Sequence, residues 1–518
     1  MEKLTIGIIT NIVFETYTYK VKKYFRESGY DIDILSIPFE TLFLDDVRNK
    51  LYKPDILVLL LNFEFLFSDF SIDIYRNEEI ETDYIRNTIH LYKKVITYLK
   101  ACSNKRILVV GLEDYYMHTH YVRGAVGTFN LFVDKINQQL LSILDDGMVY
   151  IDLKQLIALV GIECAYDIKN KYRWCAPYSN QLVFRLINEI YKQYLVYKGV
   201  TPKCLVLDCD NVLWGGILSE DGMEQIQLGN YGRGKAFQDF QRFLVMLYLH
   251  GVILAVSSKN DMEDIQEVFR THSGMVLKEE HIAYFQVNWN SKAESLKKIS
   301  TFLNIGLEDM VFVDDSRFEI ESINILLPQV KTIQYKPDSI YKDLACFNLS
   351  NVDNINEIEK RNATYRTNSS REELKKQYEK YQEYLNALNM KVLIKEALPT
   401  DLYRIAELTQ RTNKCTNGKR FTFDKLKKQI EEVTLYSVFV SDKFSDMGLV
   451  GAIAVKGEAL LLFSLSCRVL GRNIENKMME FIKGRHSIKK IYFTSTKKNI
   501  ALQEMFIDNF KESELIED

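Results

Sequence analysis

The sequence has few residues that interrupt secondary structure and lacks the patterns of secretion or membrane insertion. Only 7 of its 518 residues are proline, and its 8 cysteines form no Cys-x-x-Cys pair, which argues against a disulfide framework or a zinc site. The longest apolar runs, such as ILVLLL at 56–61, are too short to cross a bilayer. The start, MEKLTIGIITN, has no charged segment followed by a cleavable apolar stretch. We therefore expect a cytoplasmic protein.

A large charge of one sign is also missing. The 67 lysines and arginines nearly balance the 70 aspartates and glutamates, for a net charge of −3. A chain without a basic field has no general attraction for nucleic acid or acidic membranes, so we expect neither as a partner. What is present is an ordinary globular composition, 47% hydrophobic and 26% charged. The length predicts several domains.

The order of apolar runs and helical patterns predicts three globular regions and one connector. They span 1–199, 200–345, 346–390 (the connector) and 391–518. The first region has strand-like runs such as LTIGIIT and ends in a helical pattern over 179–199, and the second region has strand-like runs at CLVLD, VILAVSS, MVFVDD and VKTIQ between helical stretches. This alternation predicts α/β layers with mostly parallel sheets. The last region mixes strands and helices. In the connector, Leu374, Tyr378, Tyr381 and Leu385 recur at helical spacing among charged residues, and we expect an exposed helical connector there.

Polar residues gather at the strand ends of the second region. They are Asp208, Asp210, Ser257, Ser258, Lys292, Asp314 and Asp315. The carboxyl ends of parallel strands line one crevice of an open α/β sheet, so these side chains are expected to lie close together. Several aspartates in one crevice repel each other unless a cation lies among them, and such hard oxygen ligands favour Mg²⁺.

This set of residues fits phosphoryl transfer. A carboxylate can attack phosphorus once Mg²⁺ and a lysine neutralise the phosphate oxygens. A second carboxylate two residues later can protonate the leaving oxygen and then deprotonate the attacking water.

The four elements, in this order and at these strand ends, resemble the haloacid dehalogenase (HAD) superfamily of phosphotransferases. The resemblance implies Asp208 as the nucleophile and Asp210 as the acid/base. It implies phosphate binding by Lys292 and by Ser258 or, as the alternative, Ser257. It also implies that Asp314 and Asp315 join Asp208 and the Asp210 carbonyl in holding Mg²⁺. The short distance from the first motif to the second leaves little room for a large cap domain.

The surrounding segments resemble a narrower family, the FkbH-like proteins. The segments are LDCDNVLWGGILSEDG, GKAFQDFQ, GVILAVSSKND, VNWNSKAE, VFVDDSRFE, LTQRTNKCTNGKRFT and LSCRVLGRNIE. The resemblance implies a HAD domain followed by an acetyltransferase-like (GNAT) domain. It implies transfer of a glyceryl unit from 1,3-bisphosphoglycerate to the phosphopantetheine thiol of an acyl carrier protein. DCDNV, DDSR and TNKCT stand where the family usually has DLDNT, DDNP and TNQFN, so the donor is the least secure part of this prediction.

Cys467 is the candidate for a covalent step in the last region. It precedes Arg468 and Arg472, and a thiolate is stabilised beside cations, so Cys467 could accept the acyl group as a thioester. The alternative is a buried structural cysteine. Arg468-x-x-Gly471-Arg472 is similar to the pyrophosphate loop of acetyltransferases, which makes both arginines candidates for binding phosphate. Two further readings stay open, a HAD phosphatase without acyl transfer and a non-catalytic carrier-protein scaffold.

The first region loosely resembles an SGNH-hydrolase-like α/β domain. Such hydrolases need a serine just after the first strand, where this chain has Ile9-Thr10-Asn11-Ile12, so we expect no hydrolysis there. A metal site at His118 and His120 is a further, less favoured reading. The sequence therefore predicts an α/β multidomain protein, with an SGNH-like domain, a HAD-like Rossmannoid parallel sheet in the middle and a GNAT-like α+β domain at the end.

Overall fold

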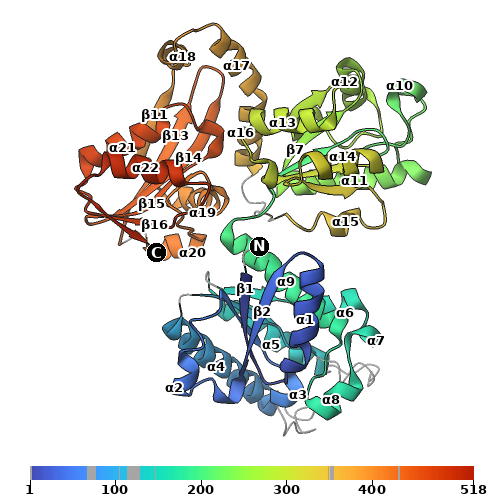
Figure 1. Cartoon of the computed structure of the whole chain (residues 1–518), viewed down its shortest axis with the longest axis vertical. Coiled ribbons are helices and arrows are strands. Elements are labelled where there is room, and N and C mark those ends of the chain that lie inside the picture. Colours follow the sequence, from blue (N-terminus) through green and yellow to red (C-terminus); the bar gives the residue numbers. More distant parts are fainter. Residues whose placement is uncertain are drawn as a thin grey trace. The chain divides into compact units, whose positions relative to one another are not determined.

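The computed structural model describes residues 3–66, 78–103, 105–113, 129–145, 148–347, 349, 355–429 and 432–517. The chain folds into two compact units, Met1–Lys198 and Gly199–Asp518, which are shown in Figure 1. His118 and His120 lie outside the described residues. No helix in the described part of the chain is long and apolar enough to cross a membrane.

The first unit contains a five-stranded parallel sheet in the order β2-β1-β3-β4-β5. The strands are β1 (Lys3–Thr10), β2 (Asp31–Pro38), β3 (Ile56–Leu60), β4 (Arg106–Val110) and β5 (Met148–Ile151). Two hydrophobic clusters fill the unit, and alternate residues of the strands belong to one or the other. This is a doubly wound arrangement, and it explains why β3 is buried at all five positions.

Helices α1 to α5 of the first unit lie between these strands along the chain, and α6 to α9 follow β5 (Figure 1). They are α1 (Glu15–Glu27), α2 (Asp45–Arg48), α3 (Phe63–Leu66), α4 (Glu78–Cys102), α5 (Phe129–Ile143), α6 (Leu153–Val160), α7 (Ile162–Ala165), α8 (Ile168–Trp174) and α9 (Asn180–Lys198). The helix expected over 179–199 is confirmed as α9. The residue after it, Gly199, has the positive φ of +67° that glycine adopts easily beyond a helix end.

The second unit begins with another five-stranded parallel sheet, here named the middle sheet, in the order β10-β9-β6-β7-β8. Its strands are β6 (Cys204–Leu207), β7 (Ile253–Ser258), β8 (Ile282–Val287), β9 (Met310–Asp314) and β10 (Lys331–Gln334). Its helices are α10 (Leu218–Asp221), α11 (Gly232–Leu249), α12 (Met262–Thr271), α13 (Lys292–Leu303), α14 (Arg317–Leu326) and α15 (Ile340–Asp343). The sequence analysis missed β8, but the other four strands are confirmed.

The connector is helical, as expected, and consists of α16 (Ile355–Arg366), α17 (Asn368–Lys376) and α18 (Tyr381–Ala387), but it is only partly exposed. The helical structure is interrupted between α17 and α18. Tyr378 and Tyr381 are 36% and 48% exposed, whereas Tyr384 and Leu388 are buried. Charged residues buried in α16 and α17 pack on both neighbouring sheets. Helical spacing alone did not show which face would be covered.

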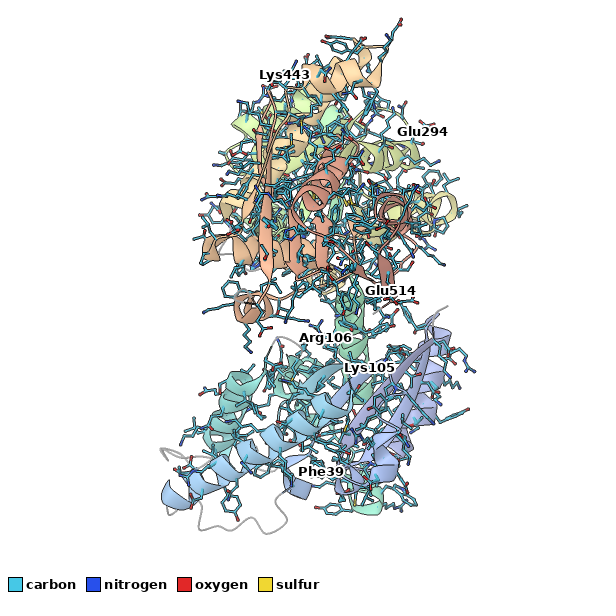
Figure 2. All side chains as sticks on the ribbon, turned by 90° about the vertical axis from the view of Figure 1, so that its left-hand side faces the viewer. Phe39, Lys105, Arg106, Glu294, Lys443 and Glu514 are labelled. Carbon is cyan, nitrogen blue, oxygen red and sulfur yellow. The ribbon has the colours of Figure 1, made fainter. Side chains whose placement is uncertain are left out.

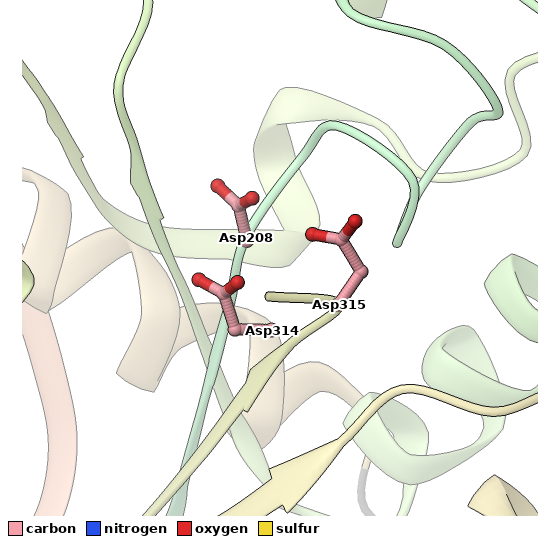
Figure 3. A group of neighbouring side chains, drawn as sticks. All are labelled: Asp208, Asp314 and Asp315. Carbon is pink, nitrogen blue, oxygen red and sulfur yellow. The ribbon is translucent and has the colours of Figure 1, made fainter. Parts of the chain in front are cut away.

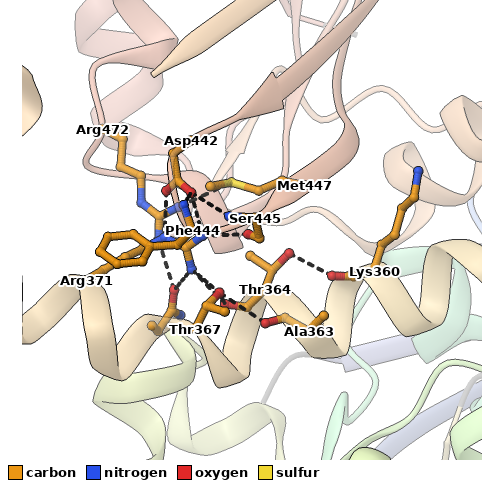
Figure 4. Close-up of polar contacts among 11 residues, drawn as sticks. Lys360, Ala363, Thr364, Thr367, Arg371, Asp442, Phe444, Ser445, Met447 and Arg472 are labelled. Carbon is orange, nitrogen blue, oxygen red and sulfur yellow. Dashed lines mark hydrogen bonds and ion pairs between the residues drawn. The ribbon is translucent and has the colours of Figure 1, made fainter. Parts of the chain in front are cut away.

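A buried ion pair fixes the connector to the following sheet (Figure 4). Arg371 of α17 donates to both carboxylate oxygens of Asp442, at 2.7 and 3.0 Å, and also to the carbonyl of Thr364 at 3.0 Å. Its side chain is 2% exposed and that of Asp442 is 0% exposed. Such a bidentate arrangement is the strong form of an arginine–carboxylate contact. It joins α16, α17 and the β13–β14 hairpin into one structure.

The C-terminal sheet has the order β11-β13-β14-β15-β16-β17, and β12 pairs with β15. The strands are β11 (Lys391–Glu396), β12 (Cys415–Thr416), β13 (Thr434–Ser441), β14 (Asp446–Lys456), β15 (Ala459–Leu465), β16 (Lys490–Phe493) and β17 (Glu514–Glu517). Its helices are α19 (Leu402–Arg411), α20 (Phe423–Gln429), α21 (Ile474–Arg485) and α22 (Ile500–Asn509). Figure 2 labels Lys443, whose amide in the β13–β14 turn donates to the Leu388 carbonyl of the connector. The sheet is antiparallel except for the last two pairings, so this region is mixed α and β.

Candidate active site

The centre of the candidate site is a buried lysine that contacts two aspartates. Lys292, the first residue of α13, donates to Asp208 Oδ1 at 2.7 Å and to the carbonyl of Ser257 at 2.5 Å. Its ammonium also lies 3.4 Å from Asp314 Oδ2. Burial alone would lower the pKa of Lys292, but the two carboxylates raise it above its ordinary value. The lysine therefore stays charged at the carboxyl edge of the middle sheet.

Three carboxylates meet at this edge (Figure 3). Oxygens of Asp208, Asp314 and Asp315 all lie within 4.8 Å of one another. Burial, and then repulsion by Asp208, raises the pKa of Asp314 to about 6, and the same two causes raise the pKa of Asp315. Asp314 Oδ2 is buried and accepts no hydrogen bond from the described residues. Three oxygen ligands with excess negative charge fit a small divalent cation such as Mg²⁺.

Asp210 occupies a separate, hydrogen-bonded position. Its Oδ1 accepts from the indole of Trp214 at 3.0 Å and from the amide of Leu218 at 3.1 Å, and its Oδ2 accepts from Asn260 at 2.9 Å. Burial raises the pKa of this carboxyl, as is useful for an acid that must hold a proton. Its carboxylate is not part of the three-aspartate group. This agrees with the resemblance, which implied only the backbone carbonyl of Asp210 as a metal ligand. The sequence analysis did not single out Trp214 and Asn260 as its partners.

The two serines at the end of β7 are both buried and differ in their contacts. Ser258 Oγ accepts from Asn260 at 3.1 Å, whereas Ser257 Oγ has no hydrogen-bond partner among the described residues. Ser257 holds Lys292 through its backbone carbonyl. Phosphate binding by Ser258 or by Ser257 stays a prediction, although both residues end the strand beside Asp208.

Cys467 lies at the opposite edge of the middle sheet. Asn304, just after α13, donates to the Cys467 carbonyl at 2.8 Å. Cys467 is also near Lys203, whose pKa is lowered by burial. Lys203 precedes β6 and Asp208 follows it, and five residues of a strand span about 16 Å. The sequence analysis placed Cys467 and Asp208 in one reaction, but the structure does not bring them together.

The two candidate arginines make contacts within their own region. Arg468 is buried and donates to the carbonyls of Met447 at 2.7 Å and Leu449 at 3.4 Å. Arg472 is half-buried and donates to Asn368 Oδ1 at 3.1 Å (Figure 4), and burial lowers its pKa. These contacts give both side chains a structural role, and substrate binding by them stays a prediction.

The neighbouring strands β15 and β16 of the C-terminal sheet move apart after a short paired stretch, and Asn417 lies between them. These strands pair only at Ala459–Leu460 and Lys490–Ile491. Beyond that point Asn417, which is fully buried, donates to the carbonyl of Leu461 on β15 and to that of Tyr492 on β16, each at 2.9 Å. The gap between the two strands is thus filled by the chain itself.

The carboxyl edge of the first sheet carries polar residues that bind one another. Asn11 after β1 and Asn62 after β3 exchange two hydrogen bonds of 3.0 and 2.7 Å. Asn62 also donates to Glu113 at 2.9 Å, and the Tyr166 hydroxyl donates to the other oxygen of Glu113 at 2.9 Å. No serine stands after β1. The described residues at this edge therefore form a hydrogen-bond network, and Asn11 stands directly after β1.

Comparisons with known proteins support the fold of the middle region. No family model matches the sequence, and no significant match is found among curated proteins. The N-terminal part of protein BF1531 from Bacteroides fragilis, which contains a phosphatase domain complexed with Mg, matches with 24% identity and a TM-score of 0.57. The match covers 68% of this chain and 94% of that chain. A HAD family enzyme from Bacteroides thetaiotaomicron, in complex with magnesium and inorganic phosphate, is 14% identical, with a TM-score of 0.21 over 28% of this chain and 99% of that chain.

The first of these likenesses shows a shared fold. It agrees with the HAD-like parallel sheet predicted from the motifs at the strand ends. The aspartates of this chain lie at the carboxyl edge of such a sheet, the place where open α/β folds bind their ligands.

Proposed function

We propose that the protein is a Mg²⁺-dependent enzyme that transfers or hydrolyses phosphoryl groups at Asp208. The observation that supports this most directly is the group of three aspartates around the buried ammonium of Lys292. Mg²⁺ would be held by Asp208, Asp314 and Asp315, and when bound it would neutralise phosphate oxygens. A structural role explains this arrangement poorly, because two buried carboxylates and a partly buried third beside one lysine leave excess negative charge.

The residues of the chain have distinct tasks in this reaction. A carboxylate oxygen of Asp208 attacks phosphorus, and the bond from phosphorus to the leaving oxygen breaks while Lys292 neutralises charge on the phosphate. Asp210 donates a proton to that leaving oxygen. Its Oδ2, which accepts one hydrogen bond against two at Oδ1, has room for the proton. Asp210 then takes a proton from water, which attacks the aspartyl phosphate and releases inorganic phosphate.

The substrate we propose is an acyl phosphate of the 1,3-bisphosphoglycerate type, and the acceptor is the phosphopantetheine thiol of an acyl carrier protein. The FkbH-like segments on both sides of the site support this assignment. In this scheme the thiolate of Cys467, in the C-terminal, GNAT-like region, attacks the acyl carbon, the bond from that carbon to the phosphate oxygen breaks and inorganic phosphate leaves, and the thioester then passes to the carrier thiol. Asp208 acts on the remaining phosphate ester of the donor. An SGNH-like first domain, without hydrolytic residues, would bind the partner.

A second candidate is phosphate hydrolysis without acyl transfer. It is favoured by the position of Cys467 near Lys203, at the edge of the middle sheet opposite to Asp208. The length of β6, about 16 Å from Lys203 to Asp208, lies between the two edges, so a donor held at Asp208 does not reach the edge where Cys467 lies. In the C-terminal sheet, Asn417 bridges β15 and β16 where the two strands part.

One experiment separates the two candidates. The protein is incubated with 1,3-bisphosphoglycerate, Mg²⁺ and a holo acyl carrier protein, and intact masses of both proteins are recorded with released phosphate. Acyl transfer is expected to add a glyceryl mass to the carrier. Phosphate release with an unmodified carrier would support phosphate hydrolysis alone and contradict acyl transfer.

Two variants assign the steps. Asp208→Asn is expected to stop phosphate release, whereas Cys467→Ala is expected to remove any acylated form of the enzyme. Normal transfer by Cys467→Ala would contradict the covalent step at that thiol. Phosphate release by Asp208→Asn at the wild-type rate would contradict the whole proposal, because the reaction would then not take place at Asp208.

A further inference from the structure

Large apolar side chains stand exposed along the carboxyl edge of the middle sheet. They are Ile217, Met262, Trp289 and Phe318, which are 37%, 36%, 63% and 76% exposed, and together they are named the apolar rim. Each follows a different strand, β6, β7, β8 and β9 respectively. These strands are neighbours in the order β9-β6-β7-β8. Because neighbouring strands lie about 4.8 Å apart, the rim extends over about 14 Å.

The rim adjoins the residues of the candidate active site. Ile217 directly precedes Leu218, whose amide donates to Asp210 Oδ1 at 3.1 Å. The indole of Trp289 donates to Asp261 at 3.4 Å, just before α12 begins. The rim is therefore held by the same loops that hold the acid/base candidate.

The rim lies on both sides of Asp208. Met262 is the first residue of α12, and Phe318 is the second residue of α14. The helix α12 packs into one hydrophobic cluster of the middle sheet and α14 packs into the other, so the two helices cover opposite faces. Asp208 follows β6, which lies between β7 and β9. A substrate that enters toward Asp208 thus passes between apolar side chains.

The extent of the rim indicates a substrate longer than a small phosphorylated acid. The described residues 208–231 contain only the four-residue helix α10, so this segment provides no cap domain. Grouped apolar side chains that remain exposed beside a site mark a binding surface. A three-carbon acid with a phosphate is polar at both ends and is too short to cover the rim. The observations therefore favour a substrate with an apolar extension.

The charges beside the rim indicate that this extension is neutral. Most of the exposed charged residues next to it are acidic: Glu220, Asp221, Asp261, Glu263 and Asp264. Two cations beside the rim, Lys259 and Arg317, form ion pairs with Glu319 and Glu321. Such a surface repels a further anionic group, for example a nucleotide or an acidic membrane. A neutral chain with apolar segments fits it better.

We propose that the apolar rim binds the pantetheine arm of a phosphorylated acyl thioester, whose phosphate ester is hydrolysed at Asp208. The inference rests on the proposed phosphoryl transfer and its carrier, and it adds an order of steps. The acyl group is transferred to the carrier thiol first and loses its phosphate afterwards. Cys467 and Asp208 lie at opposite edges of the middle sheet, and this order suits their separation because the arm brings the acyl group to the second edge.

The chemical step at Asp208 leaves the thioester intact. A carboxylate oxygen of Asp208 forms a bond to phosphorus, and the bond from phosphorus to the ester oxygen of the acyl group breaks. Asp210 gives its proton to that oxygen, which becomes a hydroxyl of the acyl group. Water then attacks the aspartyl phosphate and releases inorganic phosphate.

The test compares phosphate release from three substrates in the presence of Mg²⁺. They are 3-phosphoglycerate, its N-acetylcysteamine thioester and its pantetheine thioester. The two thioesters have the same reacting groups, and the first lacks most of the arm. We expect kcat/KM for the pantetheine thioester to exceed that for the short thioester by about tenfold, because the arm covers apolar surface of the rim. Equal values for the two thioesters would overturn the inference and leave the phosphatase proposal intact.

Variants of the exposed rim residues assign the preference to the rim. Trp289→Ser and Phe318→Ser should each lower the ratio of kcat/KM between the two thioesters by about threefold or more. Ile325→Ser, which changes a residue that is 78% exposed farther along α14, is the matched control and should retain the ratio. A ratio that survives both rim variants would overturn the proposal.

A binding measurement separates this inference from the proposed function. The Asp208→Asn variant is titrated with the pantetheine thioester by calorimetry, and adding Phe318→Ser to it should raise the Kd by about tenfold. No phosphate release from any substrate would contradict the proposed function, and this titration still tests the rim. An unchanged Kd would overturn the inference. Octyl phosphate hydrolysed with the same kcat/KM as the pantetheine thioester would assign the rim to alkyl chains and overturn it as well.

Discussion

The first sheet and the middle sheet have the same kind of architecture but carry different polar residues at their carboxyl edges. Each has five parallel strands with buried apolar cores on both faces. After β1 the chain places Asn11, and after β6 it places Asp208. The comparison shows that the fold provides an edge where side chains converge, while the residues at the strand ends decide what that edge does.

The two edges differ in whether their polar groups satisfy one another. At the first, amides and phenols donate to Glu113 and to each other. At the second, three carboxylates surround one ammonium, and Asp314 Oδ2 accepts no hydrogen bond from the described residues. A closed network stabilises a fold, whereas an open group of like charges is stable only when a cation or substrate completes it. The described residues of the first edge thus stabilise one another, whereas those of the second leave negative charge that a cation can offset.

Asp208→Asn tests this contrast most severely. An amide in place of the nucleophile is expected to lower kcat for phosphate release by on the order of 10⁴-fold or more. The measurement is Mg²⁺-dependent release of inorganic phosphate from a generic phosphate monoester. Circular dichroism should show an unchanged fold. A loss below tenfold would mean that the edge with three aspartates does not perform the reaction.

Lys292→Met is expected to have the next largest effect. The change keeps the length of the buried side chain but removes the charge beside Asp208, and loss of one such electrostatic contact costs about 10²–10³-fold in kcat. Lys297→Met on the solvent side of the same helix is the matched control and should retain activity. If Lys292→Met retains the same kcat as Lys297→Met, the lysine at 2.7 Å from Asp208 has only a structural role.

The strand ends of the middle sheet were predictable because parallel strands all end on one edge. Apolar runs followed by Asp208, Ser258 and Asp314 therefore located the site before the structure was known. The partners of Asp210 were not predictable, because Trp214 and Asn260 reach it through loop conformations that the sequence pattern does not specify. The strand β8 was missed because it alternates small, aromatic and polar residues without a long apolar run.

The position of Cys467 was beyond sequence reasoning for a different reason. Which edge of the middle sheet receives the C-terminal sheet depends on tertiary contacts, such as Asn304 with the Cys467 carbonyl and Arg411 with the Gly251 carbonyl. Local spacing has no information about such contacts. The same limit applies to the connector, whose helices were predicted but whose buried contacts were not, since the pair Arg371–Asp442 joins residues 71 positions apart.

Glu113→Gln tests the hydrogen-bond network at the carboxyl edge of the first sheet. The amide nitrogen cannot accept a hydrogen bond, so Asn62 or Tyr166 loses its acceptor, and the first unit should lose about 1–3 kcal/mol of stability. Phosphate release should be unchanged. Urea unfolding measures the loss, and Glu27→Gln, an exposed change on α1, should stay within about 0.5 kcal/mol of the wild type. Loss of phosphatase activity in Glu113→Gln with an intact fold would contradict a purely structural first edge.

The smallest predicted effect is a pH dependence of the metal-free protein. Asp314 has a pKa of about 6 when folded and about 3.9 when unfolded, so between these values the folded state binds more protons. Stability therefore falls as pH rises through this window, and the full loss is present above pH 6. Asp314→Asn cannot titrate. In EDTA, the Tm of the wild type relative to Asp314→Asn should fall by about 2–5 °C from pH 4 to pH 6.5.

Mg²⁺ at neutral pH should restore that difference in the wild type, because the cation offsets the repulsion among Asp208, Asp314 and Asp315. It should raise the Tm of Asp314→Asn much less. Asp338→Asn, an exposed aspartate of the same unit, is the control and should follow the wild type at every pH. A Tm difference between wild type and Asp314→Asn that stays constant with pH would mean that Asp314 is ionised throughout. The middle edge would then be as well satisfied as the first.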